Sequence, residues 1–198
     1  MNRMCTEADK LCSINGFVPI AAAMMVVVPS LNPDEKLMKV VDSMIGAGFS
    51  NILIVDDGSD AAHQQPFSEA EKRVACTVLR HSKNMGKGAA LKTAFRYISA
   101  QRSDIFGVVT VDGDNQHRAE DARKLADALA LQPDVVMLGV REFKQSHVPF
   151  KSRMGNTLTS LVFRFLCGIS LSDTQTGLRA ISAKYLSRFS ELEGERFE

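Results

Sequence analysis

Short apolar runs alternate along the chain with segments in which apolar residues recur at helical spacing. The runs suited to β-strands are residues 25–28, 52–55, 74–79, 108–111 and 134–140. One helical set consists of Leu37, Val40, Val41, Met44 and Ile45. Its spacing of i, i+3, i+4, i+7 and i+8 predicts an amphipathic helix packed on a sheet. Strands that alternate with such helices predict an α/β fold, with a mostly parallel sheet flanked by helices.

Helix-start signals and further apolar faces extend this pattern. Residues 32–35, with the sequence NPDE, place a proline near the first helical position and acids in the first turn. A second helix is expected over residues 89–101, and a third presents Ala122, Leu125, Ala126 and Leu129 on one face. We expect a poorly ordered extension over residues 1–23 and one domain over residues 24–198.

Composition and charge narrow the class of protein. The chain has 198 residues, 45% of them hydrophobic, and a formal net charge of +1. These values predict a globular domain and give no indication of a nucleic-acid partner. The cysteines are Cys5, Cys12, Cys76 and Cys167. Their wide spacing argues against a zinc site and a disulfide framework, so we expect a reducing, cytoplasmic setting. The apolar stretch over residues 17–29 is too short to span a bilayer.

Polar sequences follow the predicted strands at corresponding places. DDGSD follows the second strand, NMGKG follows the third, and DGDNQ follows the fourth. Ligands of open α/β sheets bind outside the carboxyl ends of the strands. We therefore expect these loops to converge on one crevice.

The DGDNQ loop offers hard oxygen ligands. Alternate side chains of an extended segment point the same way, so Asp112, Asp114 and Gln116 are expected to form one cluster. Such oxygens suit Mg²⁺ or Mn²⁺ better than zinc. The alternative is an ordinary turn, which Asp, Gly and Asn also favour. An EF-hand is excluded, because His117 and Arg123 stand where that loop needs glycine and glutamate.

The other two loops suit a nucleotide. Asp56 and Asp57 could accept hydrogen bonds from a base or a ribose, or could instead close a turn around Gly58. Residues 86–88 bring backbone amides and Lys87 to a helix start, where a phosphate could bind. An ordinary glycine helix entry explains residues 86–88 equally well, because the named phosphate motifs do not match.

A basic segment near the C-terminus suggests a phosphate-bearing lipid or a membrane surface. Its bases are Arg141, Lys144, Lys151, Arg153 and Arg164, and its apolar helical face comprises Leu158, Leu161, Val162, Phe165 and Leu166. An ordinary core helix with a solvated rim is the alternative. Neither an HExxH nor a Gly-x-Ser-x-Gly motif occurs, which excludes the metalloprotease and hydrolase classes that use them.

The order of these motifs resembles the family-2 inverting glycosyltransferases. The series is VVVPSLN, IVDDGSD, NMGKGAAL, VDGDNQH, a strand with Arg141, SRMGNTLTSLVFRFLCG and DTQTGLRAIS, over residues 25–198. The nearest branch is that of the polyprenyl-phosphate sugar synthases, similar to dolichyl-phosphate mannose synthase. The resemblance implies a GT-A, Rossmann-like fold and a metal-dependent transfer of sugar from a UDP- or GDP-linked donor. The implied acceptor is polyprenyl phosphate, or else a glycan, in cell-envelope glycan or glycolipid synthesis.

The resemblance also implies roles for individual residues. Those on the nucleotide-sugar side are Pro29, Asn32, Asp56, Asp57, Asn84, Lys87 and Asp112. Asp112 and Asp114 would hold Mg²⁺ or Mn²⁺, with Gln116 as a further ligand or phosphate contact. Those on the acceptor side are Arg141, Arg153, Gln175 and Arg179. Arg141 would also stabilise developing charge. A phosphate acceptor needs no general base, whereas a sugar hydroxyl would need one, from Asp173 or Glu198.

Two departures from the family pattern and two alternatives remain. Ser30 and Leu31 replace a small-aromatic pair, which leaves the base preference open, and the sequence stops at GERFE where family members continue, so we expect a truncated domain. A sugar-phosphate nucleotidylyltransferase would need a loop rich in glycine and arginine after the first strand, which PSLNPDE is not. A nucleotide-sugar binding module without turnover is the other alternative. We expect the protein to work on the cytoplasmic side, at the inner face of the membrane.

Overall fold

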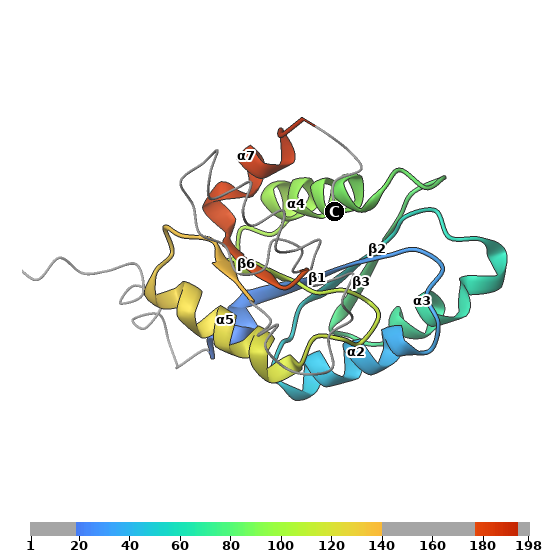
Figure 1. The fold of residues 1–198 in the computed structure, drawn as a ribbon, viewed down its shortest axis with the longest axis horizontal. Coiled ribbons are helices and arrows are strands. Elements are labelled where there is room, and N and C mark those ends of the chain that lie inside the picture. The colour runs from blue at the N-terminus through green and yellow to red at the C-terminus, as the bar shows by residue number, and fades with distance from the viewer. Residues whose placement is uncertain (1–18, 140–176, 194–198) are drawn as a thin grey trace, which may run out of the picture.

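The computed structural model of the chain describes residues 19–139 and 177–193. In these ranges the strands form a six-stranded sheet of order β3-β2-β1-β4-β6-β5 (Figure 1). The strands are β1 Met24–Ser30, β2 Ile52–Asp56, β3 Cys76–Arg80, β4 Gly107–Thr110, β5 Met137–Leu138 and β6 Arg179–Ser182. β1 pairs in parallel with β2 and β4, and β2 pairs in parallel with β3. β6 is antiparallel to both β4 and β5.

Helices cover both faces of this sheet (Figure 1). The α-helices are α2 Lys36–Gly46, α3 Gln65–Ala70, α4 Lys87–Gln101, α5 Ala119–Leu131 and α7 Leu186–Ser190. Short 3₁₀ turns occur at η1 Ile20–Ala23, η2 Ala61–His63 and η3 Ala183–Tyr185. α2, α3 and α5 lie on one side of the sheet, and α4 and α7 lie on the other. The predicted α/β architecture with a mostly parallel sheet is confirmed.

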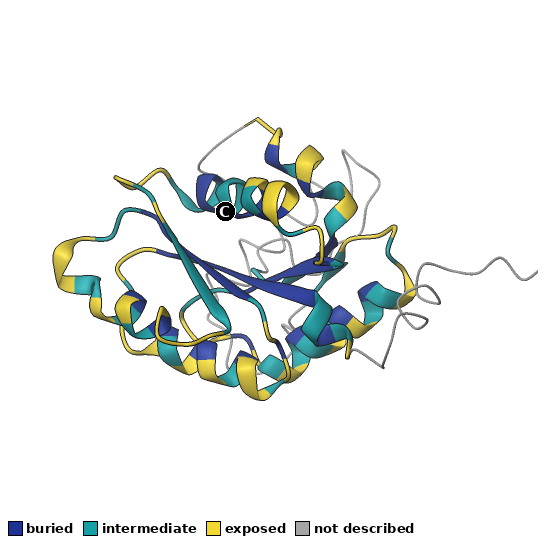
Figure 2. Cartoon of the chain, turned by 180° about the vertical axis from the view of Figure 1, so that it is seen from behind, coloured by how far each residue is buried: buried dark blue, intermediate teal, exposed yellow. Residues whose placement is uncertain are grey.

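The alternation of β1 side chains divides the core between the two helical layers. Met24, Val26 and Val28 pack in a cluster with α2 and α5, whereas Met25 and Val27 pack with α4 on the opposite face. Successive strand side chains point to opposite faces, so an unbroken apolar run is what a strand covered on both sides requires. Figure 2 shows the buried central strands between the two layers of helices, whose outer faces are exposed.

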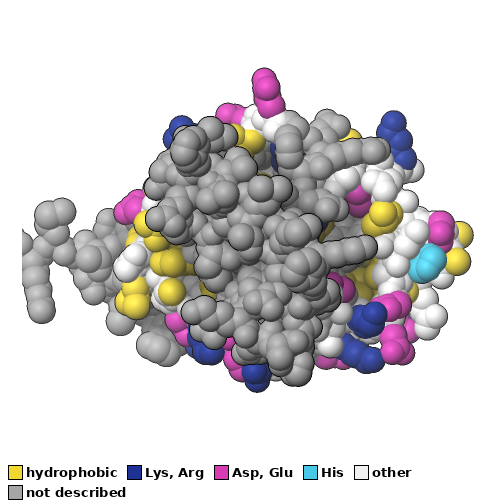
Figure 3. Space-filling model, in the orientation of Figure 1, with side chains coloured by type: hydrophobic (Ala, Val, Ile, Leu, Met, Phe, Trp, Pro, Cys, Tyr) yellow, Lys and Arg dark blue, Asp and Glu magenta, His cyan; other side chains and the backbone are white. Residues whose placement is uncertain are grey.

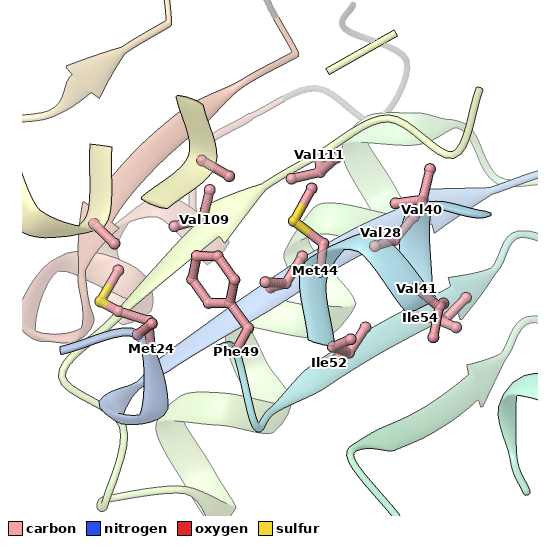
Figure 4. Close-up of a cluster of buried hydrophobic side chains, with 14 of the residues drawn as sticks. Met24, Val28, Val40, Val41, Met44, Phe49, Ile52, Ile54, Val109 and Val111 are labelled. Carbon is pink, nitrogen blue, oxygen red and sulfur yellow. The ribbon is translucent and has the colours of Figure 1, made fainter. Parts of the chain in front are cut away.

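The larger cluster of buried side chains includes an aromatic ring, that of Phe49. Phe49, only 1% exposed, lies between β1 and the end of α2, next to Met24 and Met44 (Figure 4). Burial of such a side chain contributes about 1.5–3 kcal/mol. On the face of the molecule seen in Figure 1, the described part of the surface carries both acidic and basic side chains (Figure 3), which agrees with the net charge of +1.

Several predicted element boundaries need correction. The strand expected over residues 134–140 is reduced to β5, because Asp134 bonds with Lys184 and Tyr185, and Val135 and Val136 are exposed. The third strand begins at Cys76, since Val74 is fully exposed. α4 begins at Lys87, two residues before the expected start at 89. β6 was not predicted, nor was α3.

The first described element lies inside the expected N-terminal extension. Ile20–Ala23 form η1 directly before β1, and Ala22 donates its amide hydrogen to the carbonyl of Pro19 at 2.8 Å. Ala21 is fully buried in the core, which explains why this turn is held in place. Residues 1–18 lie outside the described ranges. Within the described ranges, the longest apolar helices fall short of what a bilayer crossing requires.

Candidate functional site

A cleft of about 550 Å³ opens at the carboxyl ends of the parallel strands. It is lined by Pro29, Ser30, Leu31, Asn32, Pro33, Asp34, Lys36, Asp57, Asn84, Gly86, Lys87, Asp112, Gly113 and Asp114. These residues come from the end of β1, from the segments that follow β1, β2, β3 and β4, and from the first residues of α2 and α4. The predicted convergence of the strand-end loops is therefore observed, and the volume lies in the range of small-molecule sites.

The loop after β4 turns instead of continuing as an extended segment. β4 ends at Thr110, Asn115 has a φ of 63°, and the Asp114 carboxylate accepts the amide hydrogen of Gln116 at 3.0 Å. The predicted alignment of Asp112, Asp114 and Gln116 is wrong in this respect, because two-residue alternation requires an extended backbone. Asp112 and Asp114 both line the cleft, whereas Gln116 does not.

Asp112 lies at the centre of the polar contacts in the cleft. Its Oδ1 is 2.7 Å from the Lys87 amine, and its Oδ2 accepts a hydrogen bond from His117 Nε2 at 3.2 Å. The hydrogen bond from His117 and the ion pair with Lys87 hold the pKa of this carboxyl well below its usual range, although partial burial opposes the shift. Asp112 is therefore ionised at neutral pH.

The backbone of Gly177 packs directly against this carboxylate. A Cβ atom added at Gly177 would lie 2.2 Å from Asp112 Oδ2, so no larger residue fits without displacing Asp112. The Gly177 carbonyl also accepts a hydrogen bond from Thr110 Oγ1 at 2.7 Å. Gly177 is thus fixed to the end of β4, next to the Asp112 carboxylate.

The acidic residues of the cleft suit a hard divalent cation. Across residues 19–139 and 177–193, no group of three or more His, Cys, Asp or Glu side chains could hold a metal ion by itself. Asp112 and Asp114 supply carboxylate oxygens to the same cleft. Mg²⁺ is commonly bound by one or two carboxylates together with substrate phosphates and water. Asp112 and Asp114 could therefore serve as the protein ligands of such an ion.

Asp56 and Asp57 have different environments although they are neighbours. Asp56 Oδ1 accepts the amide hydrogen of Ser59 at 2.8 Å, and its Oδ2 accepts a hydrogen bond from Gln64 Nε2 at 3.2 Å. Asp56 is 2% exposed and does not line the cleft. These contacts match the turn-closing alternative for Asp56. Asp57 does line the cleft, so its predicted nucleotide contact stays a prediction.

The loop after β1 is attached to the loop after β2. Asn32 adopts a φ of 47°, its amide donates to Ser59 Oγ at 2.8 Å, and its side-chain oxygen accepts from the Asp60 amide at 3.0 Å. These bonds hold Asn32 and Leu31 along the cleft, where Leu31 is 46% exposed. Ser30 Oγ is buried without a hydrogen-bond partner among the described residues.

The loop over residues 81–86 packs tightly on Gly58. Gly58 has a φ of +77°, and a Cβ atom added there would lie 2.2 Å from the backbone carbon of Lys83 and 2.5 Å from the amide nitrogen of Asn84. Lys87, 38% exposed, begins α4 and lines the cleft together with Asn84 and Gly86. The positive end of the α4 dipole and the Lys87 amine therefore lie at the cleft, where an anion would be stabilised.

We expect Gly58→Ala to destabilise the protein by about 2–4 kcal/mol, since both the left-handed backbone and the overlap with the loop over residues 81–86 oppose a side chain. Gly46→Ala is the matched control. Gly46 is the last residue of α2, and an added Cβ meets nothing within 4 Å, so alanine should be neutral or stabilise by up to about 1 kcal/mol. Denaturant unfolding of both variants measures the difference. Equal stabilities would contradict the close contact between the loops.

Several predicted residues lie elsewhere. Arg141, Arg153, Asp173, Gln175 and Glu198 fall outside the described residues. Arg179 is the first residue of β6, opposite Thr110 of β4, and does not line the cleft. Their assigned roles stay predictions. His117 and Gly177 were missed, because a lone histidine and a glycine carry no recognisable spacing.

Solved structures resemble this chain in fold. A glucosyl-3-phosphoglycerate synthase from Mycobacterium tuberculosis, in complex with Mn²⁺, UDP and phosphoglyceric acid, matches with a TM-score of 0.63 at 17% identity. That match covers 84% of this chain and 58% of the other. TarS from S. aureus matches with a TM-score of 0.57 at 17% identity, over 86% of this chain and 51% of the other. The chain thus spans little more than half of these solved chains, and the predicted GT-A fold is confirmed.

Sequence similarity to curated relatives and to a family model identifies the family of the chain. The UDP-N-acetylglucosamine–dolichyl-phosphate N-acetylglucosaminyltransferase of Methanococcus voltae is 28% identical over 191 residues, covering 87% of this chain and 74% of the relative. The undecaprenyl-phosphate mannosyltransferase of Micrococcus luteus is 26% identical over 168 residues, covering 82% and 68%. The model described as "Glycosyl transferase family 2" matches residues 25–189. The family predicted from the order of motifs is therefore confirmed, and the chain belongs to glycosyl transferase family 2.

Proposed function

We propose that the chain transfers a sugar from a UDP-linked donor to a polyprenyl phosphate with the help of Mg²⁺ or Mn²⁺. The observation that carries this proposal is the cleft in which Asp112, Asp114 and the start of α4 with Lys87 meet. Paired carboxylates beside a helix N-terminus and a lysine provide what a cation-bound diphosphate needs. The names of the relatives from M. voltae and M. luteus support a polyprenyl-phosphate acceptor, and the former also names UDP.

The donor's diphosphate would lie between the acidic residues and α4. Asp112 and Asp114 would hold the cation, while the Lys87 amine, 2.7 Å from Asp112 Oδ1 in the free protein, would turn toward the phosphates. A divalent cation, when bound, would neutralise the charge that develops on the departing diphosphate. Asn32 and Leu31 would line the nucleotide, because both lie along the same cleft.

The acceptor would attack the anomeric carbon from the face opposite the diphosphate. An oxygen of the acceptor phosphate would form a bond to the anomeric carbon while the bond between that carbon and the UDP oxygen breaks, and UDP leaves. This displacement inverts the configuration of the anomeric carbon. A phosphate monoester is largely ionised at pH 7, because its second pKa is about 6, so no protein base is needed. Polyprenyl chains reside in membranes, so the reaction would take place at a membrane surface. The lipid contact predicted from the sequence for the basic segment concerns residues 141–164, which lie outside the described ranges, and it stays a prediction.

Transfer of labelled sugar to undecaprenyl phosphate in detergent tests the proposal. UDP-N-acetylglucosamine, UDP-glucose and GDP-mannose would be offered separately with Mn²⁺, and undecaprenol without a phosphate serves as the matched acceptor control. We expect label in the lipid extract with one UDP-sugar, only with the phosphorylated acceptor and only without chelator. Tight donor binding with no transfer to any acceptor would indicate a binding module instead. Transfer from GDP-mannose alone would overturn the assignment to UDP.

A further inference from the structure

A histidine with a largely enclosed side chain connects the end of β3 with the loop after β2 and with α4. His81 Nδ1 lies 2.7 Å from Asp57 Oδ1, and His81 Nε2 lies 2.9 Å from Thr93 Oγ1. The side chains of His81 and Asp57 are 8% and 5% exposed. His81 is not itself among the residues that line the cleft, whereas Asp57 is. Of its two contacts, only the one with Asp57 leads directly to a residue that lines the cleft.

The Asp57 carboxylate receives two further hydrogen bonds, both from the loop that leads into α4. The Met85 amide donates to Oδ1 at 2.9 Å, and the Gly86 amide donates to Oδ2 at 2.8 Å. A carboxylate that receives amide hydrogens acts as the acceptor, so His81 Nδ1 carries the hydrogen that it shares with Asp57. The Asp57 oxygens thus accept three hydrogen bonds, from His81, Met85 and Gly86. We name this set of three hydrogen bonds the clasp.

The clasp fixes the residues that begin α4. Gly86 is the N-cap of α4 with a φ of +100°, and Lys87 follows it directly. The Lys87 amine is the group that reaches Asp112 at 2.7 Å. The Gly86 amide is bonded to Asp57, which links the α4 N-terminus to the orientation of this carboxylate. The contact from His81 Nδ1 is one of the three that hold the carboxylate. Charged groups held in place before the ligand arrives bind it at a smaller entropic cost.

We propose that His81 is a positioning residue for the donor diphosphate, acting through Asp57 to hold Gly86 and Lys87 in place. The inference rests on the proposed function, since it takes the α4 N-terminus as the diphosphate site. It gives Asp57 a role within the protein that differs from a direct contact with the base. It also distinguishes the two contacts of His81, because only the Nδ1 contact reaches the clasp.

Two amide substitutions separate this role from simple packing. In His81→Asn, the side-chain nitrogen occupies the place of Nδ1 and can still donate to Asp57. In His81→Gln, the longer side chain fills more of the space of histidine, but its nitrogen takes the place of Nε2 near Thr93. If His81 only filled space, glutamine would be the milder change. If it holds the clasp, asparagine would be the milder change. Thr93→Val, which removes only the hydroxyl contact, is the matched control.

Amide hydrogen exchange of Met85 and Gly86 in the nucleotide-free protein reads the clasp directly. We expect His81→Gln to speed exchange of both amides about tenfold or more, since a lost hydrogen bond to a carboxylate has an effect of this size. His81→Asn and Thr93→Val should stay within about threefold of the unmodified protein. The UDP-sugar KM should rise about tenfold in His81→Gln, with a much smaller change in kcat. Thermal unfolding identifies any variant that fails to fold.

Equal losses in the two amide variants, or a milder effect in His81→Gln, would overturn the proposal. If His81→Asn did not fold, His81→Gln and Thr93→Val would still decide it, because slow exchange in both or fast exchange in both contradicts the clasp. An unmodified protein that binds no UDP, yet shows the expected exchange pattern, would support the clasp and overturn the proposed function. The exchange measurement needs no nucleotide, so the two failures are distinguishable.

Discussion

Asp112→Asn is expected to lower the rate of sugar transfer by about 100-fold or more. The substitution keeps the shape of the side chain but removes the charge that would hold the cation and that pairs with Lys87 in the free protein. Loss of one group that stabilises developing charge commonly costs a factor of this size. Initial rates at saturating Mn²⁺ and UDP-sugar, with undecaprenyl phosphate as acceptor, measure the effect.

Asp121→Asn is the matched control for the loss of a carboxylate charge. Asp121 lies in the first turn of α5, where its exposed side chain pairs with Lys124 and not with the cleft. Loss of an exposed ion pair changes stability little, and Asp121 does not line the cleft. This variant should therefore keep its transfer rate within about twofold. If Asp112→Asn retained full metal-dependent turnover while folded, the assignment of Asp112 to the cation would be wrong.

The second large effect is expected at a residue without a side chain. Gly177→Ala would place a methyl group 2.2 Å from Asp112 Oδ2, and the carboxylate must then move away from His117 and Lys87. A misplacement of about 1 Å in a reacting site can cost about 100-fold in rate. We expect kcat to fall by a factor between about 10 and 100.

Stability should change much less than rate in Gly177→Ala. The overlap is with the end of a side chain that can rotate, so we expect a loss of about 1 kcal/mol, in contrast to the backbone overlap at Gly58. Steady-state kinetics and denaturant unfolding on the same preparation compare the two quantities. A kcat equal to that of the unmodified protein would show that Gly177 does not constrain Asp112 in the working enzyme.

The spacing of apolar residues predicted those helices and strands whose pattern is set by residues close together in the sequence. The spacing of Leu37, Val40, Val41 and Met44 reflects one buried helical face, and all four are buried in α2. Unbroken apolar runs correctly indicated strands covered on both sides. Because parallel strands present their carboxyl ends at one edge, the shared cleft of the DDGSD, NMGKG and DGDNQ loops followed from the order of elements.

Contacts between distant parts of the chain were not predictable in this way. β6 is a short strand that enters the sheet between β4 and β5 in the opposite direction, which no local pattern indicates. The hydrogen bond from His81 to Asp57 joins residues 24 positions apart. The alternation rule aligned Asp112 with Asp114 and Gln116 because it presumes an extended backbone. Asn115 has a φ of 63°, so the segment turns, as the alternative interpretation expected.

Calorimetric titration of UDP into the protein tests the central claim, that the cleft binds a nucleotide diphosphate through a cation held by Asp112. The titration would be run with Mn²⁺, with chelator, and with Mn²⁺ on the Asp112→Asn variant. We predict saturable one-site binding in the first case and a loss of at least about tenfold in affinity in the other two. Binding of equal strength in all three titrations would contradict the claim, as would no binding of UDP to the folded, unmodified protein.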